Sequence, residues 1–298
     1  MPARSEAVPV SLPAGAPLAD ALAELTVGHG ATSAQAELLG GTLGHVSYCV
    51  PAVCTDGSAA VGFSAARTAR GPANVIAGSV TVGLRDDAPF VHCHAAWIDA
   101  GGVIQAGHVR PETTVGRVPL HAVLHPLPGV RNTSAVDPET RLPVFTPTAA
   151  RADIPAGGGR VAFSRVLPGE NVRDAAEQVC RDQGFRRAVV RATLGSLVGP
   201  TLRRDDSHHT LEGPAAEVIS LLGEVGPDAD PAGQLHTLVV DSAGAVHGGV
   251  LVAENSPVAV TMELLIIEDE HIQPGAAHAT ELWTALPASP STSSPWMQ

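Results

Sequence analysis

The sequence predicts a chain that mixes helices with strands and carries the same architecture twice. Two segments with helical spacing of apolar residues, 18–25 and 172–179, each end near a glycine, Gly30 or Gly184. Turn residues of the first half recur in register in the second half. Short apolar segments bounded by turn residues predict strands at 188–193, 213–225, 235–240, 246–252 and 258–267.

The matching positions of the two halves are separated by two constant differences in residue number. The positions His94, Asp99, Gly102 and Gly107 recur as His236, Asp241, Gly244 and Gly249 (236 − 94 = 142). Upstream, Gly15, Gly30 and Gly41 recur as Gly169, Gly184 and Gly195 (169 − 15 = 154). Glycines and turn aspartates occupy positions with special backbone dihedral angles, so their recurrence indicates a tandem duplication. The change of shift predicts an insertion of about a dozen residues near 50–70 of the first copy.

The first copy contains a histidine-rich hairpin. Side chains alternate along a strand, so His92 and His94 point to one face and Cys93 to the other. The turn at 99–102 reverses the chain, which brings His108 beside the pair. Three neutral imidazoles with an open fourth position are the ligand set of a catalytic zinc site. The alternative is a half-buried polar strand face that binds nothing.

The second copy lacks most of these histidines. The counterparts of His92 and His108 are Gln234 and Val250, and only His236 keeps its imidazole. If the histidines merely packed the hairpin, both copies should tolerate them equally. The asymmetry predicts one active half, which holds a divalent metal ion such as zinc, and one supporting half.

The segment 213–223, Gly-Pro-Ala-Ala-Glu-Val-Ile-Ser-Leu-Leu-Gly, resembles the glycine-(aromatic)-glutamate-isoleucine-leucine-serine-leucine-glycine strand of the PPC (plants and prokaryotes conserved, DUF296) domain. Further matching positions in the second copy are Leu235, His236, Gly248, Gly249 and Glu263. In the first copy, Gly107-His108 matches the end of the glycine-glycine-histidine step, and His121 stands at the glutamate position. The resemblance covers 12–126 and 167–268 and is weaker through the insertion.

The resemblance implies an α/β fold of the α+β type, with two tandem PPC-like domains. Each would be a mainly antiparallel sheet with a flanking helix. The expected organisation is a first domain at 8–128, a link at 129–160, a second domain at 161–270 with a degenerate site, and a flexible tail at 271–298. The family commonly assembles as trimers, which implies a trimer-based homo-oligomer. Its plant members carry AT-hook DNA-binding segments, and some bacterial members hold metal at the histidine cluster.

Composition argues against nucleic acid as a partner. Lys+Arg is 18 against Asp+Glu 30, and a net charge of −12 repels a phosphate backbone. Aromatic residues make up 3%, which excludes a stacking platform for single strands, and Arg70-Gly71-Pro72 lacks the second arginine of an AT-hook. No apolar run reaches transmembrane length, and the first residues do not resemble a signal peptide. The four cysteines show no zinc-ribbon spacing, so we expect reduced thiols, a cytoplasmic protein and no membrane partner.

Four further residues are candidates for chemistry. His121 would transfer protons, support a ligand or be a fourth ligand, and Glu112 would act as a general base. Arg110 and Arg117 would clamp a substrate carboxylate. The alternatives are an ordinary strand histidine and solvated surface charges.

Two functions remain open. The first is a metal-dependent lyase, isomerase or hydrolase that acts on a small, carboxylate-bearing substrate. The second is a non-catalytic oligomeric binding or regulatory scaffold, in which any metal is incidental. Stoichiometric metal that is lost in His92→Ala would favour the first function.

Overall fold

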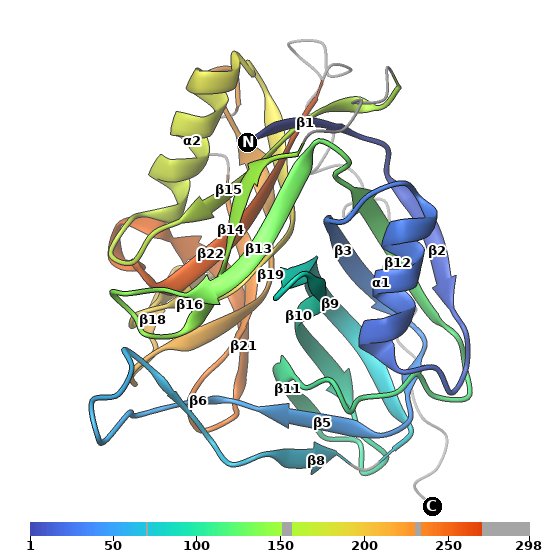
Figure 1. Cartoon of the computed structure of the whole chain (residues 1–298). Helices are drawn as coiled ribbons and strands as arrows, with labels where there is room; N and C mark the ends of the chain where they lie inside the picture. Colours follow the sequence, from blue (N-terminus) through green and yellow to red (C-terminus); the bar gives the residue numbers. More distant parts are fainter. Residues whose placement is uncertain (70, 151–156, 230–233, 270–298) are drawn as a thin grey trace, which may run out of the picture. The chain divides into compact units, whose positions relative to one another are not determined.

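The computed structural model describes residues 1–69, 71–150, 157–229 and 234–269, whose two large sheets and two α-helices are shown in Figure 1. The main path of the first sheet follows the order β2 (Val8–Leu12), β12 (Leu120–Pro126), β3 (Ala34–Gly40), β9 (Ala73–Arg85), β10 (Ala88–Ile98), β11 (Ile104–Val109), β5 (Val46–Cys49) and β8 (Arg67–Ala69). Off this path, β4 (Thr42–Leu43) and β13 (Val130–Val136) pair with β9, and β14 (Pro143–Ala149) pairs with β13. A separate small sheet joins β6 (Pro51–Ala52) to β7 (Gly62–Phe63).

The second sheet is formed by the second half of the chain and by one strand from its start. Its order is β1 (Pro2–Ser5), β15 (Gly159–Val166), β22 (Val258–Glu268), β16 (Ala188–Leu197), β19 (Ala216–Val225), β20 (His236–Val240), β21 (Val246–Val252), β17 (Thr201–Arg204) and β18 (Ser207–Thr210). A short 3₁₀-helix, Ala253–Asn255, precedes β22. Strand pairing within both sheets is antiparallel, apart from one parallel pair between β13 and β9. The predicted fold class, mainly antiparallel sheets with flanking helices, is confirmed.

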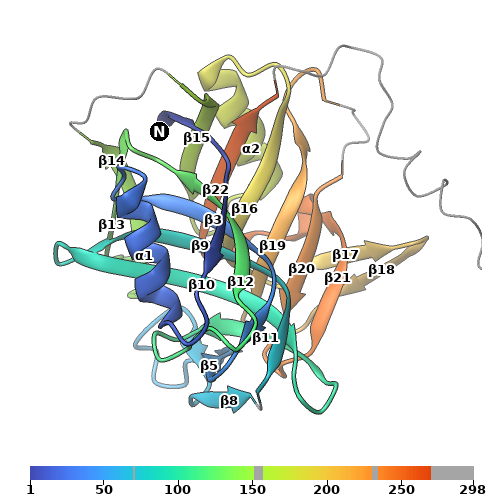
Figure 2. The same cartoon turned by 90° about the vertical axis from the view of Figure 1, so that its right-hand side faces the viewer.

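Each sheet has one helix, as Figure 2 shows. Helix α1 (Leu18–Gly28) contacts β9 and β10, and helix α2 (Val172–Gln183) contacts β15 and β22. The side chain of Asn171 accepts hydrogen bonds from the first turn of α2, and Gly184 ends this helix in the left-handed conformation. Both predicted helices are therefore confirmed, and each extends about one turn beyond its predicted end. In the described part of the chain, no helix combines the length and apolarity that crossing a bilayer requires.

The two sheets share one strand order. β2, β12, β3, β9, β10 and β11 occupy the same places in the first sheet as β15, β22, β16, β19, β20 and β21 in the second. The first residues of α1 and α2 are separated by the same 154 positions as the repeated glycines. Each sheet buries its own apolar core, formed mainly by Val, Leu and Ala, beneath its helix.

The two sheets meet through different surfaces. Strands β9, β10 and β11 of the first sheet contact β16 and β19 of the second. His94 is buried in this contact, whereas its counterpart His236 is exposed; likewise Glu263 is buried and its counterpart His121 is exposed. The histidine face of the first half therefore meets the Glu263 face of the second, while His236 and His121 stay exposed, so the arrangement is head to tail.

The contact between the sheets includes an ion pair. Arg191 on β16 binds the buried carboxylate of Glu37 on β3 with both Nε and Nη2, at 3.0 and 2.7 Å. These residues occupy equivalent positions of the two halves, 154 residues apart. A bidentate pair with one buried partner fixes the orientation of one sheet against the other.

The segment predicted as a link between the copies contains a hairpin. Strands β13 and β14 lie within it, and they bury Val130, Val144 and Phe145. Arg, Asn, Thr and Pro stand among these apolar residues, so composition alone obscured the strand pattern. The predicted tail at 271–298 lies outside the described residues.

Candidate metal centre

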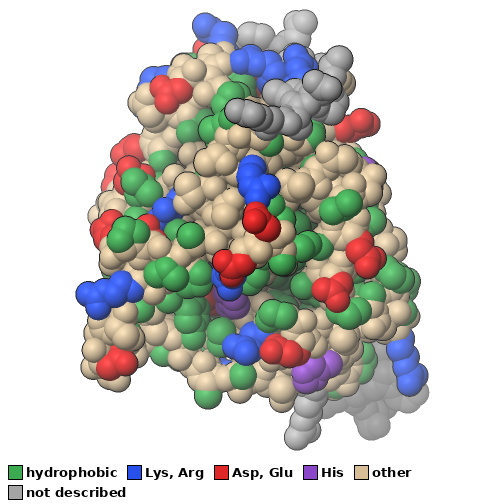
Figure 3. All heavy atoms as spheres, viewed as in Figure 1, with side chains coloured by type: hydrophobic (Ala, Val, Ile, Leu, Met, Phe, Trp, Pro, Cys, Tyr) green, Lys and Arg blue, Asp and Glu red, His purple; other side chains and the backbone are tan. Residues whose placement is uncertain are grey.

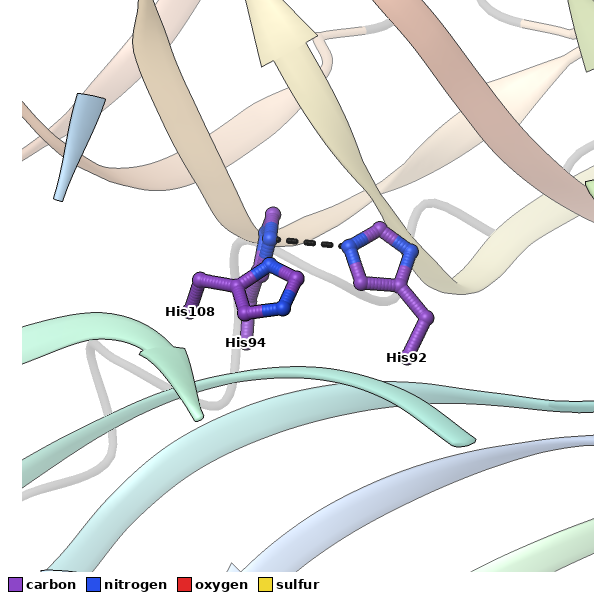
Figure 4. Close-up of side chains that lie close together, drawn as sticks. All are labelled: His92, His94 and His108. Carbon is purple, nitrogen blue, oxygen red and sulfur yellow. Dashed lines mark hydrogen bonds between the residues drawn. The ribbon is translucent and has the colours of Figure 1, made fainter. Parts of the chain in front are cut away.

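The three histidines of the first half come together on one face of the hairpin β10–β11. His92 and His94 alternate along β10, and His108 on β11 stands directly opposite His94 in the strand pairing. Figure 4 shows the three rings grouped on one side of the strands. Cys93 points to the other face, where it is buried in the core beneath α1.

The spacing of the rings suits a metal ion. One nitrogen from each ring lies within 4.8 Å of the others, and the Nε2 atoms of His92 and His94 are 3.0 Å apart. A tetrahedral zinc ion with Zn–N bonds of about 2.0–2.1 Å places its ligand nitrogens roughly 3.3 Å apart.

The second half of the chain contributes two buried carboxylates to the same place. Glu263 on β22 lies with Oε1 2.9 Å from Nδ1 of His92. Glu217 on β19 lies with Oε1 3.6 Å from Nε2 of His94 and 4.0 Å from Nδ1 of His108. The Oε2 atoms of both glutamates are buried, and no hydrogen-bond partner among the described residues reaches them.

The hydrogen bonds indicate which ring nitrogens carry protons. Nδ1 of His94 donates to the backbone carbonyl of Val218 at 2.9 Å, and Nδ1 of His92 donates to Glu263. The Nε2 atoms of the two rings lie 3.0 Å apart (Figure 4). A neutral imidazole has a single N–H. With both rings neutral, the two Nε2 atoms therefore present lone pairs that a cation would bridge, and without a cation one ring carries a second proton and donates it to the other.

Burial makes the protonated forms of His94 and His108 unfavourable. Burial, followed by the neighbouring histidines, lowers the pKa of His94 well below its ordinary value. Burial likewise lowers the pKa of His108 to about 3 and raises the pKa of Glu217 to about 8. Neutral imidazoles beside two buried carboxyl groups form a donor set that a divalent cation would satisfy and neutralise.

The two buried thiols near the hairpin remain protonated. Burial raises the pKa of Cys49 to about 11 and that of Cys93 to about 12. A thiol with such a pKa is neither a nucleophile nor a ligand at neutral pH. The histidines and glutamates are therefore the reactive groups of this region.

A cavity of about 340 Å³ opens onto the histidines. Its walls are mainly apolar and are formed by Val61, Phe63, Phe90, Leu142, Pro143, Phe145 and Val260. The space-filling view in Figure 3 shows a hollow with histidine visible inside it and charged side chains at its rim. The volume lies within the range typical of small-molecule sites.

The structure brings some of the predicted residues to this cavity and not others. Arg110 and Glu112 line it and form an ion pair with a 3.5 Å separation. Arg117 and His121 are exposed and lie outside its lining. The head-to-tail contact explains this difference, because the glutamate position that reaches the histidines is that of the other copy, Glu263.

The sequence did not predict that Glu217, Glu263 and Arg85 line this cavity. Both glutamates were visible as matches to the family pattern, but the packing that brings them to the first copy was not. Arg85 ends β9 and lines the cavity, and no spacing in the sequence connects it to the histidines.

The equivalent hairpin of the second copy, β20–β21, does not carry a comparable group of metal-binding side chains. His236 is exposed, and the carbon-only side chain of Val250 stands opposite it in the pairing of β20 with β21. Over the described residues, the group of His92, His94 and His108 is the one whose ligand atoms converge.

Comparisons with known proteins identify a domain in the second half. Residues 154–270 match the Plants and Prokaryotes Conserved (PCC) domain, another name for the PPC domain. The match covers the second copy, the part of the chain in which the sequence resemblance to this family is strongest. A curated relative, the bifunctional protein GlmU of a Synechococcus strain, is 33% identical over 99 residues, which are 33% of this chain and 16% of that protein. The chain thus spans a small part of the curated relatives that it matches.

Several solved structures are similar to about half of the chain or less. A PPC protein from Pyrococcus horikoshii is 26% identical, with a TM-score of 0.32 over 37% of this chain and 78% of that one. A metal-containing protein from Archaeoglobus fulgidus is 19% identical, with a TM-score of 0.38 over 48% and 94%. A protein from Ralstonia eutropha named as a candidate DNA-binding protein is 18% identical, with a TM-score of 0.40 over 48% and 95%.

Proposed function

We propose that this protein is a metal-dependent enzyme that acts on a small, carboxylate-bearing substrate. The observation that carries the proposal is the convergence of one nitrogen from each of three imidazoles within 4.8 Å of one another, beside two buried carboxyl groups. His92, His94 and His108 would hold the ion, and zinc suits an all-imidazole set with an open position. A bound ion would supply a Lewis acid for a substrate carbonyl or carboxylate.

The protein's own residues would orient the ligands and transfer protons. Glu263 and the carbonyl of Val218 hold the rings of His92 and His94 through their Nδ1 atoms. Glu217 lines the cavity, and in its ionised form its unpartnered Oε2 would be placed to accept a proton from the substrate. Arg110 and Glu112 would act at the rim, where Arg110 attracts the substrate carboxylate.

The side chains of the chain argue against two kinds of covalent catalysis. All 18 basic residues are arginines, so no lysine is present to form a Schiff base. The raised thiol pKa values disfavour a cysteine nucleophile. Lyase, isomerase and hydrolase reactions that begin with polarisation of a carbonyl or carboxylate remain as the candidates.

We further propose that the two halves arose by tandem duplication and share one site per chain. The common strand order and the repeated turn residues support the duplication. The first half provides the imidazoles of this site and the second half provides its carboxyl groups. A second site with the halves exchanged would combine His236 and Val250 with His121, the counterparts of His94, His108 and Glu263. These three side chains do not form a ligand set, so we expect one metal equivalent per chain.

Assembly into a homo-oligomer is a separate proposal. The head-to-tail contact leaves Ile76 and His121 exposed in the first half and Leu222 and His236 exposed in the second. Their counterparts are buried between the sheets, so these faces are suited to a further unit and to a trimer-based assembly. Light scattering at micromolar concentration tests this, and a stable monomer would contradict it.

The cytoplasm is the compartment that we propose, because the four cysteines are unpaired thiols in the structure.

A non-catalytic scaffold remains the second function, favoured by the extended contact between the sheets. The net charge of −12 disfavours binding to nucleic acid in either case.

The deciding experiment combines metal analysis with a substrate screen. Purified protein should hold about one zinc per chain, and His92→Ala should lose it while His236→Ala keeps it. Small keto, hydroxy and unsaturated acids would then be screened with zinc-loaded and chelator-treated protein. A rate that is unaltered by removal of the metal would refute the enzymatic proposal and leave the scaffold.

A further inference from the structure

The cavity has a second charged end, opposite the histidines. Phe90, His92 and His94 lie on one face of β10, and residues two apart on a strand are separated by about 7 Å. The guanidinium carbon of Arg85 lies 3.5 Å above the ring of Phe90. Arg85 therefore lines the cavity beside Phe90, roughly 13 Å along β10 from His94.

Arg85 is held in place without an anionic partner. Its Nε and Nη2 atoms donate to Oγ of Ser134 at 3.3 and 3.1 Å, and the ring of Phe90 supports its plane. No carboxylate lies within 4 Å of it among the described residues, whereas Arg110 at the rim is paired with Glu112. Burial lowers the pKa of Arg85, and the neighbouring Asp86 opposes this shift, as expected for a guanidinium that has lost part of its water.

The ionisable side chains differ between the two ends of the cavity. Glu217 and Glu263 place two buried carboxyl groups at the histidine end, while Arg85 places a cation at the other. The walls between the two ends are mainly apolar. A carboxylate entering this cavity is attracted by Arg85, whereas the carboxyl groups of Glu217 and Glu263 offer it no counter-charge, and a short alkyl chain or single ring would fill the space between.

We infer that Arg85 binds the carboxylate of the substrate and that the substrate has an apolar body which directs its reacting group toward the histidines. The inference rests on the proposed function for the identity of the reacting end, but the anion site itself does not require a metal. Arg85, and not Arg117, is then the residue that selects an anionic ligand. The ligand class is a small organic acid of about five to eight carbons, as the cavity volume allows.

The test compares hexanoate with hexanamide, which has the same length and no charge. Calorimetric titration of metal-free protein should show hexanoate binding at least about tenfold more tightly, as expected for a hydrogen-bonded ion pair in a partly buried site. Arg85→Gln should reduce this ratio to near one, and Arg85→Lys should leave an intermediate ratio. Arg117→Gln makes the same change of net charge outside the cavity and should leave the ratio intact.

Three results would overturn the inference: absence of hexanoate binding at millimolar concentration, a ratio near one in the wild type, or a ratio that survives Arg85→Gln in folded protein. Circular dichroism verifies the fold of each variant. The metal content of the same preparations is measured separately, so a protein that lacks metal but keeps the Arg85-dependent ratio refutes only the proposed enzyme. A protein that holds zinc but shows no such ratio refutes only the anion site.

Discussion

Removal of the Glu263 carboxylate should weaken metal binding without removing any metal ligand. Glu263 accepts a hydrogen bond from Nδ1 of His92 at 2.9 Å, and its side chain is 1% exposed against 15% for the imidazole. The bond fixes the ring and leaves Nε2 as the ligand atom. Groups that orient metal-binding histidines in this way contribute about 10- to 100-fold in metal affinity, or about 1.4–2.7 kcal/mol.

We expect Glu263→Ala to reach the upper part of that range, because it removes both the acceptor and the buried negative charge. Glu263→Gln keeps an acceptor oxygen and removes only the charge, so its loss should fall near tenfold. The assay is competition for zinc with a chromophoric chelator at neutral pH. Thermal unfolding of the metal-free variants separates lost affinity from lost fold.

Glu268→Gln provides the matched control. Glu268 lies on the same strand and binds Arg160 at 2.8 Å, away from the histidines. Its substitution should leave the zinc affinity within about twofold of the wild type. The reasoning is refuted if Glu263→Ala binds zinc as tightly as the wild type, or if Glu268→Gln loses as much affinity as Glu263→Ala.

Other predictions address the ligands, the pH dependence and the contact between the sheets. His108→Ala should abolish stoichiometric zinc binding while His236→Ala retains it, as elemental analysis would show, and retention of zinc by His108→Ala would contradict the ligand set. In metal-free protein, Glu217 holds its proton up to a pKa of about 8 in place of 4.5, so its contribution to stability is complete below pH 4.5 and is lost as the pH rises through 8. The loss in free energy of unfolding is at most about 5 kcal/mol. Urea unfolding between pH 5 and 8 measures it, and Glu217→Gln should remove this pH dependence. An equal change of stability with pH in both proteins would contradict the prediction. Arg191→Ala should lower the free energy of unfolding by about 1–3 kcal/mol, because a buried carboxylate loses its partner. Arg186→Ala, which breaks an exposed pair, should change it by less than about 0.5 kcal/mol, and equal effects of the two substitutions would contradict the reasoning.

The local architecture was largely predictable from the sequence. The spacing of Leu18, Ala21 and Leu22 on one helix face fixed the first helix, and the shift of 154 residues located the second. The hairpin geometry of His92, His94 and His108 follows from alternation along β10 and one tight turn, both of which are local properties.

The packing of the two halves was not predictable. A single sequence shows that each half resembles the other, but equivalent halves can meet through equivalent or through different surfaces. The head-to-tail contact decides that Glu217 and Glu263 reach the histidines and that His121 stays exposed. The hairpin of β13 and β14 was missed for another reason: proline and threonine interrupt its apolar positions, so its strands have the composition of a link.

The most direct test of the central claim is the location of metal in crystals of zinc-loaded protein by anomalous scattering at the zinc edge. The account predicts one strong peak per chain, within about 2.0–2.2 Å of one nitrogen from each of His92, His94 and His108. No peak at these histidines, or an equal peak beside His236, would contradict it.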